Sequence, residues 1–296
     1  MQKSIEMNQK NVFPTLKIHF LIYISCLFGI SFYQTAFATT TVRQTKSFRE
    51  VLLETENALK KVSNDKVLVV FDIDNTLLTM STNMGSDQWY AWQSDLIKQK
   101  KFEDAVGNST DDLQSAQGVV FNLGRMHPPE PEIPNIVKDI QKTKVHTLVL
   151  TSRGNEYRSV TERELKRNGF EFTGNSIGPT LGYAGLYLPG CVEKSTARMV
   201  SFTNGVFMGA GQHKGQMLRC LLKKTKSSNI KKIIFVDDSE RNIKAVSEIM
   251  DLDKIDIVSL HYTAMSEQIQ AFEIGDKKLE KEAWQEILKI QKKYFH

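Results

Sequence analysis

The sequence contains few of the residues that mark specialised protein classes. Only 3 Cys, 7 Pro and 17 Gly occur among 296 residues, and this composition excludes collagen-like and low-complexity chains. The formal net charge is a mild +5, and no basic stripe indicates nucleic-acid binding. With 41% hydrophobic and 25% charged residues, the chain is expected to form one large globular domain, or one domain with an insertion.

Long apolar runs are also absent, apart from one near the N-terminus. That run, residues 18–33, has about 16 residues, whereas a membrane-spanning helix needs roughly 20. Lysines precede it, and an Ala-x-Ala sequence ending at Ala38 follows it. We therefore predict a secretory signal peptide over residues 1–38, cleaved after Ala38. Residues 39–296 would then form a periplasmic or secreted domain with no stable membrane span. A retained membrane anchor is the alternative.

Two cysteines, Cys191 and Cys220, lie downstream of that segment. An oxidising compartment permits a disulfide between them, but does not require one. Two separate buried thiols are an equally good interpretation, so the sequence leaves both open.

Strand-like and helix-like segments alternate along the rest of the chain. Continuous runs of β-branched, aliphatic and aromatic residues predict buried strands at about 66–71, 145–150, 205–208, 230–236 and 255–260. Apolar residues at helical spacing predict helices at about 47–62, 133–140, 157–168, 214–225, 243–249 and 279–294. This alternation indicates an α/β fold with a Rossmann-like parallel sheet, flanked by helices and joined by right-handed crossovers.

Two stretches interrupt the alternation. Residues 80–130 are polar and poor in β-branched residues, which predicts a small helical cap inserted into the domain. Residues 171–203 are rich in Gly, Thr and aromatic residues, which indicates a possible β-rich flap. The cap contains Trp89, Tyr90 and Trp92. Core packing is the common fate of such aromatics, and a surface facing a substrate is the alternative.

Residues with side chains suited to phosphate chemistry stand at the ends of the predicted strands or open the helix that follows: Asp72, Asp74, Thr151, Lys214, Asp237 and Asp238. The carboxyl ends of parallel strands line one crevice, so these groups are expected to converge. Carboxylates can hold a hard cation such as Mg²⁺, without which acids in one pocket would repel each other. A hydroxyl and an ammonium can bind phosphate oxygens, and a carboxylate can attack phosphorus.

These segments resemble the four ordered motifs of the haloacid dehalogenase (HAD) superfamily over about residues 66–260. The motifs are Val-Val-Phe-Asp72-Ile-Asp74-Asn-Thr76, Leu-Val-Leu-Thr151, Lys214 and Ile-Ile-Phe-Val-Asp237-Asp238. The predicted signal peptide is a further similarity, to the secreted acid phosphatases of that superfamily. The resemblance implies a secreted, Mg²⁺-dependent phosphomonoester hydrolase that acts through an aspartyl-phosphate on a phosphorylated small molecule or phosphoprotein.

The resemblance also implies a role for each matching residue. Asp72 resembles the nucleophile, and Asp74 resembles the general acid/base, which argues against a dehalogenase. Thr151 and Lys214 would bind phosphate. The metal would be held by Asp72, by the backbone carbonyl of Asp74, and by the acidic pair of the fourth motif. In that pair, the alignment favours Asp238 as the ligand, with Asp237 supporting it.

Other interpretations compete with these roles. A calcium loop beginning at Asp72 is excluded, because it needs a glycine where Leu77 stands and an acid where Asn83 stands. The acids of the fourth motif could cap a helix instead, and so could Thr151. A HAD fold that only binds a partner, and a phosphotransferase, are the alternative functions.

Four further basic residues leave choices open. Lys194 and Lys223 compete with Lys214, which is preferred because it opens a helix just after a strand. Arg153 either reaches the pocket or lies in a solvated loop. His213 is interpreted as structural.

Overall fold

The central strand β2 (Val67–Phe71) shows why this sequence forms a sheet that is covered on both faces. All five of its residues are buried. Alternate side chains of a strand point to opposite faces. Accordingly, Val67, Val69 and Phe71 join one hydrophobic cluster, and Leu68 and Val70 join another. A continuous apolar run is therefore the expected sequence of this strand.

The structure is a computed structural model that describes residues 38–295. The predicted signal peptide lies outside these residues, except for Ala38. Among residues 38–295, no helix is both long enough and apolar enough to cross a membrane.

Seven strands form the main sheet, in the order β1-β9-β8-β2-β5-β7-β6. The other six are β1 (Thr40–Thr45), β5 (His146–Thr151), β6 (Ser201–Thr203), β7 (Val206–Met208), β8 (Lys232–Asp237) and β9 (Asp256–Tyr262). All neighbours pair in parallel except β6 and β7. The sheet confirms the predicted α/β, Rossmann-like fold. It adds β1, which was not predicted, and it includes β6 from the predicted flap.

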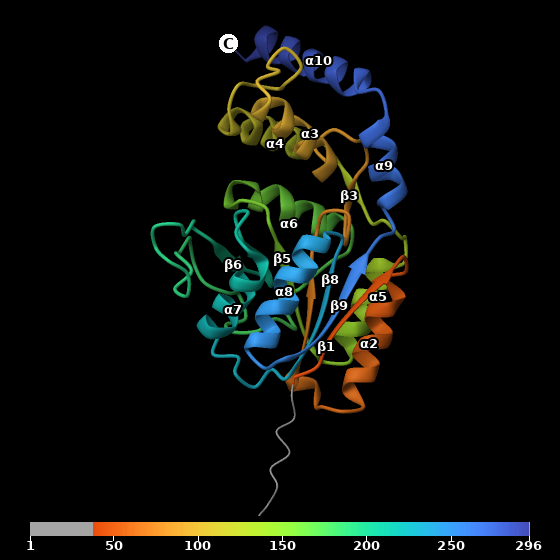
Figure 1. Cartoon of the computed structure of the whole chain (residues 1–296), viewed down its shortest axis with the longest axis vertical. Helices are drawn as coiled ribbons and strands as arrows, with labels where there is room; N and C mark the ends of the chain where they lie inside the picture. Colours follow the sequence, from red (N-terminus) through yellow and green to blue (C-terminus); the bar gives the residue numbers. More distant parts are fainter. Residues whose placement is uncertain (1–37, 296) are drawn as a thin grey trace, which may run out of the picture. The chain divides into compact units, whose positions relative to one another are not determined.

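Helices cover both faces of this sheet (Figure 1). Apolar residues of α2 (Arg49–Leu59), α5 (Ile133–Lys142) and α6 (Arg158–Arg167) join the Phe71 side. Apolar residues of α7 (Lys214–Lys224) and α8 (Glu240–Leu252) join the Leu68 side. These helices agree with the predicted ones, although α2 begins two residues later than expected.

A helical cap stands over the carboxyl ends of the strands, as predicted. The inserted segment folds into β3 (Thr79–Met80), α3 (Asp87–Lys98), α4 (Thr110–Leu123) and β4 (Met126–His127). The C-terminal helices α9 (Ser266–Ile274) and α10 (Lys278–Tyr294) pack against it, an arrangement that the sequence did not predict (Figure 1). Trp92 meets Phe272 edge to face at 6.1 Å, and Asn83 Nδ2 donates to Glu280 Oε1 at 3.0 Å.

The predicted flap contains less β-structure than expected. Residues 171–203 are mostly turns and bends, with β6 and two isolated bridges, Gly182–Thr203 and Tyr187–Val200. Gly182 has a φ of +80°, and a Cβ there would lie 2.1 Å from the Phe202 oxygen, so the turn requires glycine. Tight glycine turns of this kind interrupt strand pairing.

A disulfide between Cys191 and Cys220 ties this flap to α7. The two Cα atoms lie 5.4 Å apart, within the range that a disulfide requires. The structure thus decides between the two interpretations of the cysteines that the sequence left open.

Candidate active site

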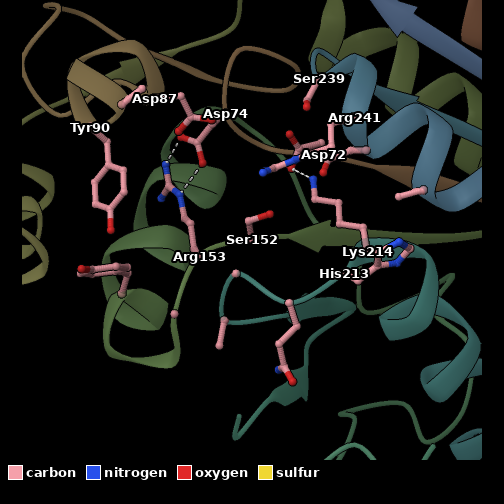
Figure 2. A pocket seen from close by; sticks show the side chains of 18 of the residues that line it. Asp72, Asp74, Asp87, Tyr90, Ser152, Arg153, His213, Lys214, Ser239 and Arg241 are labelled. Carbon is pink, nitrogen blue, oxygen red and sulfur yellow. Dashed lines mark hydrogen bonds and ion pairs between the residues drawn. The ribbon is translucent and has the colours of Figure 1, made fainter. Parts of the chain in front are cut away.

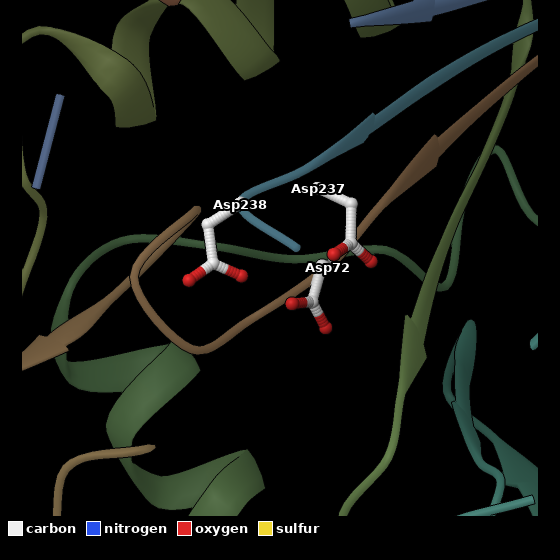
Figure 3. Close-up of side chains that lie close together, drawn as sticks. All are labelled: Asp72, Asp237 and Asp238. Atoms are coloured by element: carbon white, nitrogen blue, oxygen red, sulfur yellow. The ribbon is translucent and has the colours of Figure 1, made fainter. Parts of the chain in front are cut away.

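Three carboxylates converge where β2 and β8 end. Asp72 directly follows β2, Asp237 ends β8, and Asp238 comes next. The parallel register aligns the two strand ends, and Asp72 N donates to Val236 O at 3.0 Å. Carboxylate oxygens of the three aspartates lie within 4.8 Å of one another (Figure 3). The predicted convergence of the first and fourth motifs is therefore present.

Lys214 extends between two of these carboxylates. Its Nζ lies 2.5 Å from Asp72 Oδ1 and 2.7 Å from Asp237 Oδ2, and the side chain is buried. The helix α7 that carries it approaches α8 very closely: a Cβ on Gly215 would lie 2.1 Å from the Ala245 oxygen. A glycine directly after the lysine thus permits the helix packing that brings Lys214 to the carboxylates.

The structure also distinguishes Lys214 from the competing lysines. Lys194 and Lys223 are both exposed, and neither lines the cleft that holds Lys214. His213 caps α7 by accepting a hydrogen bond from Gln216 N at 3.3 Å, which is the structural role expected for it. It also lines the cleft.

The charges of this cluster do not balance. Burial and the neighbouring Asp237 raise the pKa values of both Asp72 and Asp238 well above their usual range. Burial lowers the pKa of Lys214, but Asp237 and Asp72 raise it by more, so this side chain stays an ammonium. When all three carboxyl groups are ionised beside one ammonium, the cluster carries an excess of two negative charges, which a divalent cation would offset. Oxygen ligands of this kind suit Mg²⁺.

Asp237 and Asp238 differ in how far their oxygens are already engaged. Asp237 accepts hydrogen bonds from Lys214, from Ser239 N at 2.9 Å and from Asn242 Nδ2 at 3.0 Å. The carboxylate of Asp238 makes no hydrogen bond with the residues that the structure describes. Asp238 is therefore the more available metal ligand of the pair, with Asp237 held rigidly beside it.

Asp74 is turned away from this cluster and toward Arg153. Arg153 Nη2 lies 2.7 Å from Asp74 Oδ1, and Nε lies 2.9 Å from Oδ2, a two-pronged ion pair (Figure 2). Arg153 also donates to Thr161 Oγ1 at 2.9 Å and lies 4.1 Å from the Phe121 ring centre. Arg153 is only 6% exposed, so it reaches the pocket and is not a solvated loop residue. The Asp74 carboxylate is not part of the cluster formed by Asp72, Asp237 and Asp238.

The loop that carries Asp74 is fixed by a turn and by the cap. Asn75 has a φ of 54°, a left-handed conformation that Asn tolerates better than most residues. Its side chain accepts from Thr79 Oγ1 at 3.1 Å and donates to Gln88 Oε1 of α3 at 3.4 Å. The cap is thereby linked to the residue next to Asp74.

Thr151 ends β5 and is almost fully buried. Its Oγ1 accepts a hydrogen bond from Arg153 N at 3.1 Å, which closes a local turn and does not cap a helix, because the next helical turn begins at Asn155. The neighbouring Ser152 lines the cleft, and Thr151 is not among the lining residues. Its phosphate-binding role stays a prediction.

A cleft of about 890 Å³ lies between this floor and the cap. Charged and aromatic side chains line it, including Asp87, Tyr90, Phe121, Glu156, Tyr157, Arg198 and Arg241 (Figure 2). Desolvation and the nearby Asp74 raise the pKa of Asp87 to about 7, although Asp87 is exposed to solvent. Asp87, Arg198 and Arg241 were not identified from the sequence, because each stands in an ordinary polar segment without a motif.

The three cap aromatics have different surroundings. Trp89 is completely buried. Tyr90 lines the cleft, and Trp92 packs against α9. Core packing is therefore confirmed for Trp89, whereas the position of Tyr90 is compatible with the substrate-facing alternative, which stays a prediction.

The fold and site together define an α/β protein with an acidic cluster at the carboxyl edge of a parallel sheet, covered by a helical cap. Residues 44–294 match a family model described as Protein of unknown function (DUF2608). The match covers most of the chain, and the protein belongs to this family. No curated protein matches the sequence significantly.

Proposed function

We propose that this protein is a Mg²⁺-dependent phosphomonoester hydrolase of the HAD type. The observation that carries the proposal is the placement of Lys214 within 2.5 Å of Asp72 and 2.7 Å of Asp237, at the floor of a cleft. An ammonium beside a carboxylate nucleophile suits transfer of a phosphoryl group, whose oxygens carry negative charge. The order and types of the motif residues support the same assignment.

In the first step, Asp72 attacks phosphorus. Asp72 Oδ1 is bound by Lys214, and Oδ2 has no hydrogen-bond partner among residues 38–295, so Oδ2 is the attacking atom. The Oδ2–P bond forms as the bond from phosphorus to the alcohol oxygen breaks. The departing oxygen takes a proton from Asp74, and an aspartyl-phosphate remains.

In the second step, Asp74 accepts a proton from water, which attacks the aspartyl-phosphate and releases phosphate and a free Asp72. The ion pair with Arg153 orients both oxygens of Asp74. Arg153 acts as a positioning residue, since its guanidinium faces Asp74 and the Phe121 ring.

The carboxylates of Asp72 and Asp238, supported by Asp237, would hold Mg²⁺. When bound, this ion supplies the positive charge that the cluster lacks and neutralises charge on the transferring group. Lys214, which already contacts two of the carboxylates, stays in place to bind a phosphate oxygen.

We also propose that the protein acts outside the cytoplasm, after removal of residues 1–38. The disulfide between Cys191 and Cys220 supports this location, because disulfides persist mainly in oxidising compartments.

The direct test is hydrolysis of p-nitrophenyl phosphate by the purified protein. We expect phosphate release that requires Mg²⁺, stops with EDTA and returns when Mg²⁺ is restored. Release that rises with added alcohol, with formation of a new phosphoester, would identify a phosphotransferase. A protein that binds no Mg²⁺ and hydrolyses no phosphomonoester would refute the proposal.

Replacing Lys214 with Ala is expected to raise the barrier to turnover by roughly 3 kcal/mol, about 10²-fold in rate, as when one donor to a developing negative charge is lost. Lys194→Ala and Lys223→Ala are matched controls, because both lysines are exposed and lie outside the cleft. The measurement is kcat/KM for p-nitrophenyl phosphate. A Lys194→Ala variant with the larger defect would contradict the placement of the third motif.

A further inference from the structure

The cap presents an acidic side chain whose position the proposed chemistry does not explain. Asp87 is the first residue of α3, it lines the cleft, and Figure 2 shows it beside Asp74. Its side chain makes no hydrogen bond or ion pair with residues 38–295. Asp74, by contrast, is paired with Arg153, and Asp72 with Lys214.

The position of Asp87 is fixed by its neighbours. Ser86 Oγ caps α3 by accepting from Trp89 N at 3.3 Å. The following residues, Gln88 and Trp89, are buried, and Gln88 accepts from Asn75 Nδ2. An acid at a helix N-terminus gains a little from the helix dipole. That gain does not require the carboxylate to face a cleft that already contains several acids.

Aromatic rings and a second carboxylate surround the same end of the cleft. Tyr90 lies three residues after Asp87, on the same face of α3. Tyr157 and Glu156 also line the cleft, and burial together with Glu156 raises the pKa of the Tyr157 hydroxyl. Tyrosine rings together with carboxylates form the kind of site that binds an ammonium group.

The positively charged side chains near this end of the cleft are either paired with a carboxylate or fewer than the carboxylates there. The Arg153 guanidinium is bound to Asp74 by two hydrogen bonds. Arg198, from the flap, also lines the cleft, where it is one cation against the two carboxylates Asp87 and Glu156. Figure 2 shows Arg241 on the Asp72 side of the cleft, away from Tyr90.

This arrangement affects which leaving alcohol the cleft can accept. In the proposed function, Asp74 protonates the departing oxygen, so the alcohol part of the substrate lies on the Asp74 side of Asp72. Asp87 lies next to Asp74, where it faces the alcohol and not the phosphoryl group. An anionic alcohol would be repelled there, and a cationic one attracted.

We propose that Asp87, with Tyr90 and Tyr157, selects phosphomonoesters of amino alcohols, whose ammonium group lies close to the ester oxygen. This inference rests on the proposed function for the chemistry, and it adds the substrate class. Primary and quaternary ammonium groups share the required charge. Ethanolamine phosphate and choline phosphate are therefore the two probes.

The test compares choline phosphate with 3,3-dimethylbutyl phosphate, which has the same shape without the positive charge. With Mg²⁺ at pH 8, where Asp87 is mostly ionised, we expect kcat/KM to be about tenfold or more higher for choline phosphate. In Asp87→Asn this ratio should fall toward one. Asp95→Asn is the matched control, because Asp95 lies on the same helix and is exposed and paired with Lys98. That variant should keep the wild-type ratio.

Equal kcat/KM values for the charged and neutral esters in the wild-type protein would overturn the inference, and so would an unchanged ratio in Asp87→Asn. A preference for ethanolamine phosphate over choline phosphate would keep it and restrict the site to primary amines. If no ester is hydrolysed, the proposed function fails separately. Calorimetric binding of choline phosphate and of its neutral isostere then tests the inference alone, and equal affinities refute it.

Discussion

Replacing Asp72 with Asn is expected to reduce turnover of any phosphomonoester by about 10⁴-fold or more, on the scale seen when a catalytic nucleophile is lost. The amide has almost the same shape as the carboxylate, but it is a far weaker nucleophile and metal ligand. Lys214 retains Asp237 as a partner at 2.7 Å, so the buried ammonium is not left unpaired. The measurement is kcat for p-nitrophenyl phosphate, together with acid-quench trapping of a phosphoenzyme, which should disappear.

The fold of the Asp72→Asn variant is expected to be intact. Burial and Asp237 raise the pKa of Asp72, which means that the ionised form is disfavoured in the folded protein, and a neutral Asn relieves this. A melting temperature close to that of the wild type would confirm this. Asp139→Asn, at an exposed residue paired with Lys142, serves as a control. Near-normal turnover by a folded Asp72→Asn variant would remove Asp72 as the nucleophile.

Replacing Asp74 with Asn is expected to impair alkyl phosphates much more than aryl phosphates. An alkoxide leaves poorly unless it is protonated, whereas a nitrophenolate leaves without help. General acid catalysis contributes about 10² to 10⁴ in rate, so the gap between ethyl phosphate and p-nitrophenyl phosphate should widen by a factor in that range. The second step also loses its base, and rapid-quench experiments should show phosphoenzyme accumulating.

The contacts of Asp74 provide the control for this experiment. Asn cannot form the two-pronged ion pair with Arg153, so some loss can arise from a displaced loop. Such a displacement would slow phosphoenzyme formation from both substrates equally, whereas loss of the proton donor slows phosphoenzyme formation only from the ester with the poor leaving group. Equal losses on both esters, with no phosphoenzyme, would show that Asp74 only orients the loop.

Much of the core could be predicted because buried parallel strands leave a clear pattern. The strand β2 is buried on both faces, and its sequence is one unbroken apolar run. The edge strand β1 gave no such signal, because most of its residues are exposed and polar. Its pairing depends on β9, and only the folded chain reveals that partner.

The residues of the candidate site can likewise be divided into those that the sequence reveals and those that only the structure reveals. Asp72, Lys214 and Asp238 could be identified because each directly follows a strand or opens a helix. Asp87 could not, since an acid after Ser86 has the appearance of an ordinary helix start, and its position in the cleft depends on how the cap is placed. The pairing of Arg153 with Asp74 joins residues 79 positions apart, so it could not be predicted from the sequence either.

The order of strands in the sheet has a consequence for the folding of the chain. The first strand, β1, pairs with β9, and Thr39 N donates to Asp256 Oδ1 across 217 positions. In the sheet, β9 and β8 separate β1 from β2. Until residues 232–262 are available to pair, β1 has no partner and β2 has one open edge. Contacts this distant in sequence form slowly, so the sheet stays incomplete and the chain stays prone to aggregation until these last strands have joined.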